Sequence, residues 1–443
     1  MRTILARALF CLAACFIFLL SCSTSWAGQQ SPKILTFGVC EDYDKNQDLK
    51  GIALDFQLLN QLEIDEMRVS FGWDDYEPAP GQYDFAWLHQ FANLAAQYGI
   101  KLHPYICYAA PWAGSGHWNS FPNDYRDWEK FCYALAQDLK THPNIVSYEI
   151  WNEEDITGPE GWWGGNIDQY MKLLRSGSLA IRAADPGKQI LFGGLTGPRV
   201  RWLKEVTQAG YGRYYDVLPF HCYVETWPWW GTRIKEVEQA LDESFYNQFL
   251  PQNENVGGGQ PIWVNEIGYS TMSRSENEQA NYLARAVAYF LSAPEIEHIC
   301  WYEIKDNNPG NSVIGDAHNY HLGITTWPER KPKLAFYTLD MLSDLLNHKS
   351  VIPAEEEISV AVVSGSTGKL YKRLFRISDG SQILFIYDKQ ADCTVNVTLA
   401  TPGKTAYRYA LDGTSALYPD FANNTISNLQ LKAGQVEIFK IVP

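Results

Sequence analysis

The sequence predicts an α/β fold, a (β/α)8 TIM barrel followed by a small C-terminal antiparallel β-sandwich, on the strength of two residue patterns. Short apolar runs alternate with longer amphipathic segments from residue 33 to about residue 348. After residue 350, apolar and polar residues alternate one by one, as in half-buried strands. Eight strand-then-helix units in the first region give about forty residues per unit, enough for a barrel with loop insertions. We therefore expect the barrel over residues 33–349 and the sandwich over residues 351–443.

The eight apolar runs are the expected barrel strands. They span residues 34–40, 66–71, 101–108, 145–151, 189–194, 216–223, 261–268 and 297–304. Segments with apolar residues at helical spacing separate them, for example at 54–62, 85–98, 128–139, 167–184 and 277–291, and a last helix is expected over 332–347. Regular alternation of the two patterns favours a parallel sheet with helices around it.

The C-terminal segment shows the period of two that is typical of strands. Residues 382–387 are one example, and turns are expected at residues 378–380, 401–403 and 411–413. The last tryptophan of the chain is Trp327, so the sandwich contains none. Because a second binding surface would be expected to display aromatic rings, we expect this domain to brace the barrel.

The first 27 residues have the pattern of a secretory signal peptide. Two arginines precede an apolar run over residues 8–20, which is too short to count as a membrane span. Two ends compete: residues 25–27 suit cleavage before Gly28, whereas residues 19–22 resemble a bacterial lipobox that would leave a lipid anchor on Cys22. We favour cleavage before Gly28 and expect an exported bacterial chain, secreted or periplasmic, with no transmembrane segment after processing.

Composition excludes several classes of function. The formal net charge is −15 and no run rich in lysine or arginine occurs, so we expect neither a nucleic-acid partner nor an anionic membrane surface. No Cys-x-x-Cys pair occurs, and the cysteines beyond the leader are too sparse for a disulfide scaffold. Most of them lie in apolar runs, so we expect buried free thiols.

Two carboxylates follow expected strands of the barrel. Glu153 comes at the end of the fourth strand and Glu266 lies near the end of the seventh. In a TIM barrel the carboxyl ends of the strands form the active site, so both acids should meet at its mouth. Such a pair suits glycoside hydrolysis, with carboxyl groups about 5–5.5 Å apart for retention or about 6.5–9.5 Å apart for inversion. The sequence leaves that distance open.

The motifs around the two acids resemble those of clan A retaining glycoside hydrolases. Trp-Asn-Glu ends the fourth strand at 151–153, and Asn-Glu-Ile-Gly ends the seventh at 265–268. Further matching pieces occur in order at residues 67–69, 77–78, 81–85, 220–223, 301–302 and 331–332, so the resemblance covers about residues 33–348.

Within this clan the chain is most similar to glycoside hydrolase family thirty-nine, which includes β-xylosidases, α-iduronidases and bacterial exopolysaccharide endoglycosidases of the PslG type. Length and layout favour the last group. Two residues depart from the commoner motifs: Glu154 replaces a frequent proline after the first acid, and Asn265 replaces a frequent threonine or serine before the second.

The resemblance implies a role for each matched residue. Glu153 would be the acid/base and Glu266 the nucleophile of a double displacement. Arg68 would keep Glu266 ionised and aimed, and Asn152 would bind the sugar hydroxyl next to the anomeric carbon. The other expected substrate-binding residues are His221 and Tyr223, which would orient the nucleophile and the sugar, and Trp112, Trp162, Trp163 and Trp301, which would stack on sugar faces.

Metal and cofactor sites are not expected. His318 and His321 have no carboxylate at a spacing suited to zinc. The acidic residues 42–48 imitate a calcium loop, but Gln47 stands where glycine is required and Ala53 where glutamate is required. Trp227, Trp229 and Trp230 form a bulky cluster that suits a cover for the barrel rim as well as a sugar platform.

The sequence therefore predicts an exported retaining glycosidase that needs no cofactor and acts on a polysaccharide or oligosaccharide. Endo action on an extracellular polysaccharide is favoured, because tryptophans recur on several loops and could line an extended cleft. An exo-acting enzyme similar to β-xylosidases or iduronidases is the alternative. A catalytically silent carbohydrate-binding matrix protein is a third reading, against which the retained Glu153, Glu266 and Arg68 argue.

Overall fold

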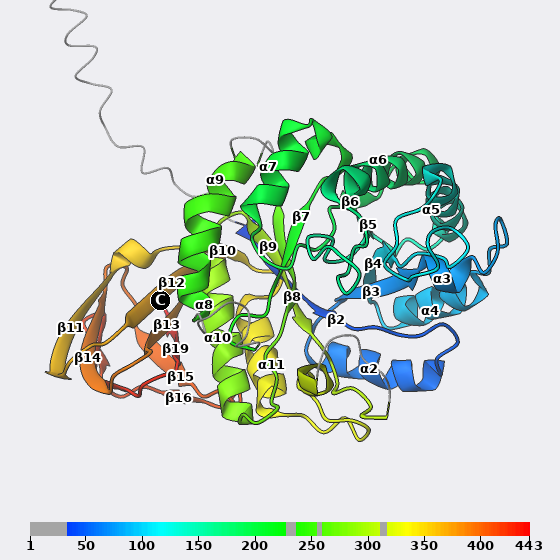
Figure 1. Cartoon of the computed structure of the whole chain (residues 1–443). Helices are drawn as coiled ribbons and strands as arrows, with labels where there is room; N and C mark the ends of the chain where they lie inside the picture. Colours follow the sequence, from blue (N-terminus) through cyan, green and yellow to red (C-terminus); the bar gives the residue numbers. More distant parts are fainter. Residues whose placement is uncertain (1–32, 227–235, 255–258, 311–316) are drawn as a thin grey trace, which may run out of the picture. The chain divides into compact units, whose positions relative to one another are not determined.

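Eight parallel strands form the sheet of the barrel (Figure 1). In the computed structural model, which describes residues 33–226, 236–254, 259–310 and 317–443, they are β2 (Thr36–Cys40), β3 (Glu66–Gly72), β4 (Lys101–Cys107), β5 (Ser147–Ile150), β6 (Gln189–Leu191), β7 (Leu218–Cys222), β8 (Ile262–Ile267) and β9 (Ile296–Tyr302). Their order is β6-β5-β4-β3-β2-β9-β8-β7, and parallel bridges from Leu191 to Val217 and from Leu195 to Phe220 connect its two ends. The predicted barrel is confirmed.

The predicted leader with Cys22, and the tryptophans at 227, 229 and 230, lie outside the described residues, so the expectations for them stay predictions. Within the residues described, no helix is both long and apolar enough to cross a membrane. Cys40, Cys107, Cys132, Cys222, Cys300 and Cys393 are buried free thiols, as expected.

Helices connect the barrel strands, and their starts follow from capping residues in the sequence. Asn166 and Ser275 each begin a helix with a reciprocal capping box, formed with Gln169 and Glu278 respectively. The helices are α2 (Leu49–Gln61), α3 (Trp73–Tyr76), α4 (Ala86–Gln97), α5 (Tyr125–Leu139), α6 (Ile167–Ala184), α7 (Val200–Gln208), α8 (Val237–Ala240), α9 (Leu250–Gln252), α10 (Glu276–Leu291) and α11 (Leu334–Leu346), with the π-helix η2 (Leu241–Phe249) and the 3-10 helices η1 (Tyr211–Tyr214), η4 (Ala317–His321) and η5 (Glu355–Glu357).

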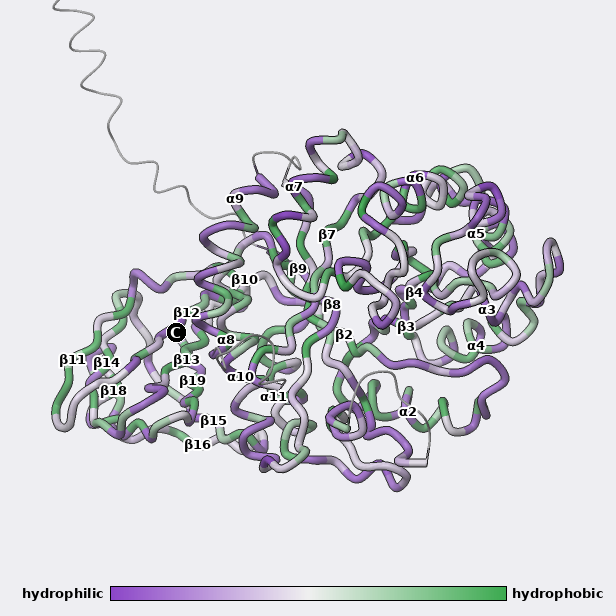
Figure 2. The backbone as a smooth tube through the Cα atoms, in the orientation of Figure 1, coloured by the Kyte–Doolittle hydropathy of each residue, from purple (hydrophilic) through white to green (hydrophobic). Residues whose placement is uncertain are grey.

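Hydrophobic and hydrophilic residues alternate along these helices (Figure 2). In α5, the buried side chains are Trp128, Phe131, Cys132, Leu135, Ala136 and Leu139, at the three- and four-residue spacing of one helix face. The helices therefore bury one face against the barrel, as the apolar spacing predicts.

The amino ends of the barrel strands enclose a buried polar group. Oε2 of Glu66, at the start of β3, lies 3.1 Å from Nε2 of His103 and 3.4 Å from Nδ1 of His298. His298 also contacts Thr36, whose Oγ1 lies 2.6 Å from Nδ1, and Cys300, whose Sγ lies 2.9 Å from Nε2. This group lies at the end of the barrel opposite the candidate active site and is part of the folded core.

The C-terminal segment forms two antiparallel sheets, which confirms the predicted β domain. One sheet has the order β1-β10-β12-β13-β19-β15-β16 and the other β11-β14-β18-β17. The strands are β1 (Lys33–Ile34), β10 (Ser350–Pro353), β11 (Ile358–Gly365), β12 (Leu370–Ile377), β13 (Gln382–Asp388), β14 (Cys393–Leu399), β15 (Thr405–Tyr409), β16 (Ser415–Leu417), β17 (Phe421–Ala422), β18 (Thr425–Leu431) and β19 (Glu437–Val442).

The first apolar run differs from the prediction, because residues 34–40 do not form one strand. β1 pairs with β10 of the C-terminal sheet, and only β2 belongs to the barrel. Backbone bonds between Leu35 and residues 348–349 lie between the two strands, where the chain passes from one sheet to the other. Alternation alone cannot show that neighbouring residues of one apolar run pair with different sheets.

The C-terminal sheet packs against helices of the barrel. The backbone N–H of Val436 donates to Oδ1 of Asn281 in α10 at 2.9 Å, and Oγ1 of Thr338 in α11 donates to the carbonyl of Leu411 at 2.6 Å. Figure 1 shows α10 and α11 next to this sheet. Buried residues of the sheet and of the barrel belong to one continuous hydrophobic cluster, so the β domain covers apolar barrel surface.

Candidate active site

The two predicted acids lie at the carboxyl ends of β5 and β8. Glu266 is the fifth residue of β8, and Glu153 follows β5 after Trp151 and Asn152. Trp151 and Glu153 have φ angles of 80° and 51°, in the left-handed region that non-glycine residues rarely adopt. The backbone N–H of Glu153 donates to the carbonyl of Gly194 at 3.0 Å, which holds this strained turn.

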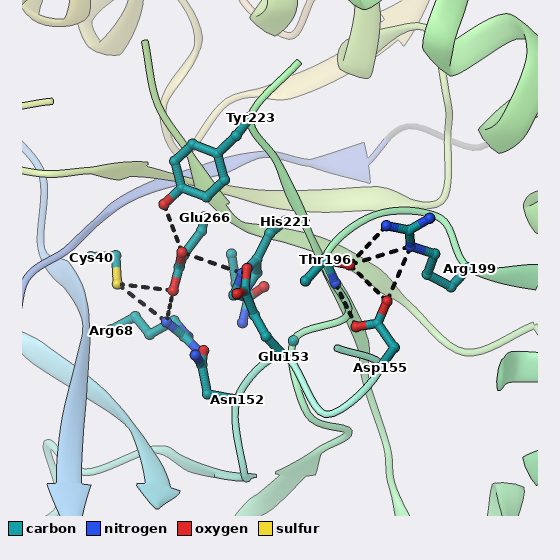
Figure 3. A network of polar contacts seen from close by, with 12 residues as sticks. Cys40, Arg68, Asn152, Glu153, Asp155, Thr196, Arg199, His221, Tyr223 and Glu266 are labelled. Carbon is teal, nitrogen blue, oxygen red and sulfur yellow. Dashed lines mark hydrogen bonds and ion pairs between the residues drawn. The ribbon is translucent and has the colours of Figure 1, made fainter. Parts of the chain in front are cut away.

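The two carboxyl groups are neighbours across the mouth of the barrel (Figure 3). One oxygen of Glu153, one nitrogen of His221 and one oxygen of Glu266 all lie within 4.8 Å of one another. Nδ1 of His221 lies 2.8 Å from Oε1 of Glu153 and 3.3 Å from Oε2 of Glu266. The sequence-predicted pair and the predicted histidine are therefore brought together.

We assign a neutral imidazole to His221, with its proton on Nδ1, because this nitrogen faces the two carboxyl groups. Its Nε2 is buried and has no hydrogen-bond partner among the described residues. A Cβ at position 194 would lie 2.2 Å from this nitrogen, so Gly194 is required for the ring to fit. Burial and the positive charge of Arg68 hold the pKa of His221 well below its ordinary value. The ring can therefore donate from Nδ1 to the carboxylates.

Glu266 receives hydrogen bonds on both oxygens. Nη1 of Arg68 donates to Oε1 at 2.5 Å, and the phenol of Tyr223 donates to Oε2 at 2.6 Å. Nη2 of Arg68 donates to Oδ1 of Asn152 at 2.8 Å. Arg68, Asn152 and Tyr223 thus lie around the acids, where sequence reasoning expected them, and Figure 3 shows them grouped with His221.

The surroundings of Glu153 and Glu266 favour a proton on Glu153 over one on Glu266. Burial raises the pKa of Glu153 well above its usual range, and the negative charge of Glu266 raises it further. Burial also raises the pKa of Glu266, but the charge of Arg68 and the hydrogen bond from Tyr223 oppose that rise. The proton shared by the pair therefore favours Glu153, and Glu266 is the acid held in its ionised form.

A second polar cluster supports the segment that follows Glu153. Asp155 accepts hydrogen bonds from the backbone N–H of Thr196 at 2.9 Å and from its hydroxyl at 2.7 Å. Nε of Arg199 donates to the same carboxylate at 3.1 Å. Figure 3 shows this cluster beside Glu153, so the turn that carries the acid is tied to the loop after β6.

The structure corrects two of the four expected stacking tryptophans. Trp301 is 1% exposed and Trp163 is 0% exposed, so neither presents a ring face to a sugar. Trp301 donates from its indole N–H to the carbonyl of Leu322, and Trp163 donates to the carbonyl of Asn166. Both rings are packed into the core around the site instead.

The other two remain partly exposed. Trp112 packs edge-on against Trp73, with ring centres 5.8 Å apart, and its indole N–H donates to the carbonyl of Glu77. Trp162 lies in a cluster with Tyr108 and Trp118, its ring centre 6.1 Å from the first and 5.6 Å from the second. All three members of this cluster are partly exposed, and a role in stacking stays a prediction.

Sequence reasoning missed several residues of the site. Glu149 binds Arg68 from β5, and Cys40 contacts both Arg68 and Glu266 from the end of β2. Tyr108, the residue after β4, packs edge-on against Trp151 with ring centres 5.8 Å apart. Burial and then neighbouring negative charges, those of Glu153 and Glu266 included, raise the pKa of its phenol. The alternation of side chains along a strand could have identified Glu149. This glutamate is a charged residue within an apolar run, and its side chain points to the same side of the strand as that of Ser147.

Glu153, His221 and Glu266 also provide the ligand atoms that a transition metal ion could take. The guanidinium of Arg68, which donates to Glu266, would repel a cation bound at that carboxylate. The expected absence of a metal or cofactor stays a prediction.

Two family models match parts of the barrel. Residues 166–320, which include Glu266, match the glycosyl hydrolase catalytic core, and residues 42–123, which include Arg68, match a β-galactosidase model. No curated protein matches the chain.

Solved structures of glycoside hydrolases share the fold. A family 39 glycoside hydrolase from Bacteroides cellulosilyticus WH2 is 18% identical, with a TM-score of 0.67, over 93% of this chain and 81% of that one. A family 39 β-xylosidase from Caulobacter crescentus is 15% identical, with a TM-score of 0.63, over 94% and 98% of the two chains. A family 30 endoxylanase from Clostridium papyrosolvens C71 is 11% identical, with a TM-score of 0.64, over 94% and 98%. At these identities the likeness shows the fold alone.

Proposed function

We propose that this chain is an exported glycoside hydrolase that cleaves O-glycosidic bonds with retention of configuration, with Glu266 as nucleophile and Glu153 as acid/base. One observation carries the proposal: two buried carboxyl groups with oxygens within 4.8 Å of each other lie at the mouth of a TIM barrel. Oxygens this close support the retaining arrangement, with carboxyl groups about 5–5.5 Å apart, over an inverting pair about 6.5–9.5 Å apart with a water between them. The match to the glycosyl hydrolase catalytic core supports the same reaction class.

The first step forms a bond between Glu266 and the anomeric carbon and breaks the bond to the leaving oxygen. Arg68 and Tyr223 orient the attacking carboxylate through their hydrogen bonds. Glu153 gives its proton to the leaving oxygen, and burial keeps that proton on the acid at neutral pH.

The second step releases the sugar. Glu153, now ionised, takes a proton from water while the water oxygen bonds to the anomeric carbon and the ester bond to Glu266 breaks. The N–H at Nδ1 of His221 faces both carboxylates, so it stabilises whichever of them is ionised in each step.

Exchange of each acid tests these roles. Glu266→Gln and Glu153→Gln should each lower kcat/KM on a polysaccharide substrate by at least about 1,000-fold without unfolding the protein. Glu154→Gln is the matched control, because it makes the same change in a buried neighbouring carboxyl group whose oxygens have no hydrogen-bond partner among the described residues. Activity retained in either of the first two variants would overturn the assignment.

Azide rescue separates the two roles. With an activated aryl glycoside, Glu153→Ala plus azide should give a glycosyl azide of retained configuration, because azide attacks the ester on Glu266. Glu266→Ala plus azide should give the inverted azide, because azide replaces the nucleophile itself. The opposite pairing would exchange the two assignments.

We further propose endo action on an extracellular polysaccharide. The partly exposed cluster of Tyr108, Trp118 and Trp162 supports this, since it lies on the loops after β4 and β5 and packs against Trp151, two residues before Glu153. Aromatic faces bind sugar rings by stacking. The N-terminal leader supports export, with cleavage before Gly28 favoured over an anchor on Cys22.

Product sizes decide between endo and exo action. The purified chain is incubated with a panel of polysaccharides, and an endo enzyme gives oligosaccharides of several lengths by mass spectrometry. Trp118→Ala and Trp162→Ala should raise KM for the polymer about tenfold and leave an aryl monoglycoside unaffected, whereas Trp202→Ala, in the partly exposed Trp202 of α7, should change neither.

An exo-acting glycosidase is the second candidate, because one structure that shares the fold along nearly its whole length is a β-xylosidase. Release of single terminal sugars alone, such as xylose or a uronic acid, would favour it. Binding of a polysaccharide without any cleavage would instead indicate a silent matrix protein.

A further inference from the structure

We propose that Glu149 is a positioning residue of this active site: its carboxylate fixes the guanidinium of Arg68, and Arg68 in turn holds Glu266 and Asn152 in their working positions. The inference rests on the glycosidase function proposed above and deepens it. Glu149 is the third residue of β5, and its side chain is fully buried. It acts through Arg68 and does not contact the substrate.

Glu149 is a fully paired buried carboxylate. Its Oε1 accepts from Nη2 of Arg68 at 2.8 Å and from the backbone N–H of Gly194 at 2.9 Å. Its Oε2 accepts from Nε of Arg68 at 2.9 Å and from Nδ2 of Asn265 at 2.7 Å. Three neighbouring strands or loops thus fix this carboxylate, and its pairing offsets the desolvation that an isolated buried charge would suffer.

Every N–H group of Arg68 has an acceptor. Nε and one N–H of Nη2 donate to Glu149, and the other N–H of Nη2 donates to Asn152. Nη1 donates to Oε1 of Glu266 at 2.5 Å and to Sγ of Cys40 at 3.2 Å. A guanidinium is planar, so the pair of bonds to Glu149 sets the direction of the donors to Glu266 and Asn152.

This geometry explains the presence of Asn265, where the commoner motifs have threonine or serine. Asn265 precedes the nucleophile, and its amide supplies one of the four bonds to Glu149. The same strand therefore carries the nucleophile and a residue that fixes the support of the nucleophile. Without Glu149, the guanidinium could rotate about its bond to Nε and withdraw from Glu266.

Glu149→Gln tests the proposal. Glutamine keeps the size of the side chain but turns an N–H₂ group toward the donors of Arg68, which breaks the bidentate pair. We expect kcat/KM on 2,4-dinitrophenyl glycosides to fall about 100-fold through kcat, with KM changed less than about threefold, because a misplaced nucleophile slows the chemical step.

Glu66→Gln is the matched control. Glu66 is a buried carboxylate at the start of β3, two residues before Arg68, and pairs with His103 instead of Arg68. Its loss should lower the melting temperature and leave kcat/KM unchanged. If Glu149→Gln behaves like Glu66→Gln, Glu149 serves only the fold and the proposal fails.

The acidic limb of the pH profile gives a second, independent readout. That limb reports ionisation of Glu266. The titratable or charged groups that interact with Glu266 are Arg68, Tyr223, Cys40, His221, Asp42, Glu149, Glu153, Tyr108, Cys300 and Tyr302. The negative charge of Glu149 raises the pKa of Glu266, so loss of that charge alone would move the limb to lower pH. Release of Arg68 removes a nearby positive charge and moves it to higher pH. We expect the limb to move to higher pH; a limb that stays or moves to lower pH overturns the proposal.

A second variant covers the case in which Glu149→Gln does not fold. Asn265→Ala removes one of the four bonds to Glu149 and should lower kcat/KM about tenfold with the same upward shift of the acidic limb. An unchanged limb in this variant would also overturn the proposal.

Crystal structures separate this proposal from the proposed function. If the wild type cleaves no glycoside, the glycosidase assignment fails, but the position of the Arg68 guanidinium in the wild type and in Asn265→Ala still decides the positioning claim. Displacement of Nη1 from Oε1 of Glu266 in the variant supports it, and an unmoved guanidinium contradicts it.

Discussion

Nδ1 of His221 lies 2.8 Å from Oε1 of Glu153, and with the proton assigned to Nδ1 the imidazole donates a hydrogen bond to this proposed acid/base. The opposite nitrogen of the ring is enclosed against Gly194, so the ring cannot turn to offer another donor. Protonation of Glu153 thus depends on a residue of β7, the strand next to the one that carries Glu266.

His221→Phe should reveal this control. A hydrogen bond donated to a carboxylate stabilises its ionised form, so its loss raises the pKa of Glu153 and moves the alkaline limb of kcat/KM to higher pH. Cleavage of an unactivated polysaccharide should fall at least about tenfold, and cleavage of a 2,4-dinitrophenyl glycoside should fall less, since that leaving group needs little acid help.

A double variant provides the control for this prediction. In the background of Glu153→Gln, the change His221→Phe should add little, because the group on which His221 acts is already lost. Fully additive losses would show that His221 acts on another part of the site.

Glu154→Met tests the residue that departs from the commoner motif after the acid/base. Glu154 is fully buried, neither of its carboxyl oxygens has a hydrogen-bond partner among the described residues, and burial raises its pKa well above the usual range. Methionine has a similar shape and no polar group to desolvate. The free energy of unfolding should rise by about 1–3 kcal/mol, with kcat/KM within about twofold of the wild type. A large loss of activity in a folded variant would instead assign a chemical role to Glu154.

The buried polar group of Glu66, His103 and His298, at the amino ends of the barrel strands, predicts how stability depends on pH. Burial lowers the pKa of His298 to about 4, against about 6.5 in an unfolded chain. The folded protein therefore binds fewer protons than the unfolded chain between these values, so this contribution to stability is complete above about pH 6.5 and is lost as the pH falls toward 4. The loss amounts to about 3 kcal/mol.

Denaturant unfolding at a series of pH values measures this effect. His298→Gln should flatten the decline of the free energy of unfolding between pH 6.5 and 4, whatever its effect at neutral pH. His117→Gln is the matched control, because His117 is exposed and should leave the slope unchanged. Equal slopes in the wild type and in His298→Gln would contradict the argument.

The parts of the molecule that follow from local pattern could be predicted from the sequence. The helix over residues 167–184 has the predicted bounds, because Asn166 caps it and its apolar residues follow the helical period. Glu153 and Glu266 could be identified because each lies in a short motif at a strand end. Strand order in a barrel then brings the two ends together.

The parts that depend on long-range packing could not be predicted. Trp163 and Trp301 were expected to face a sugar, but whether a tryptophan is buried depends on the loops that cover it. Glu149 gains its proposed role through its contact with Arg68, which lies 81 positions earlier in the chain. The pairing of β1 with β10 likewise joins the two ends of the barrel segment, which no local pattern of residues reveals.

The stereochemistry of hydrolysis tests the central claim most directly. The substrate that the polysaccharide panel identifies is cleaved in an NMR tube, and the anomeric proton of the first product is observed before mutarotation. The 4.8 Å limit on the distance between oxygens of Glu153 and Glu266 predicts a first product with the anomeric configuration of the substrate. A first product of the opposite configuration would contradict a double displacement through Glu266.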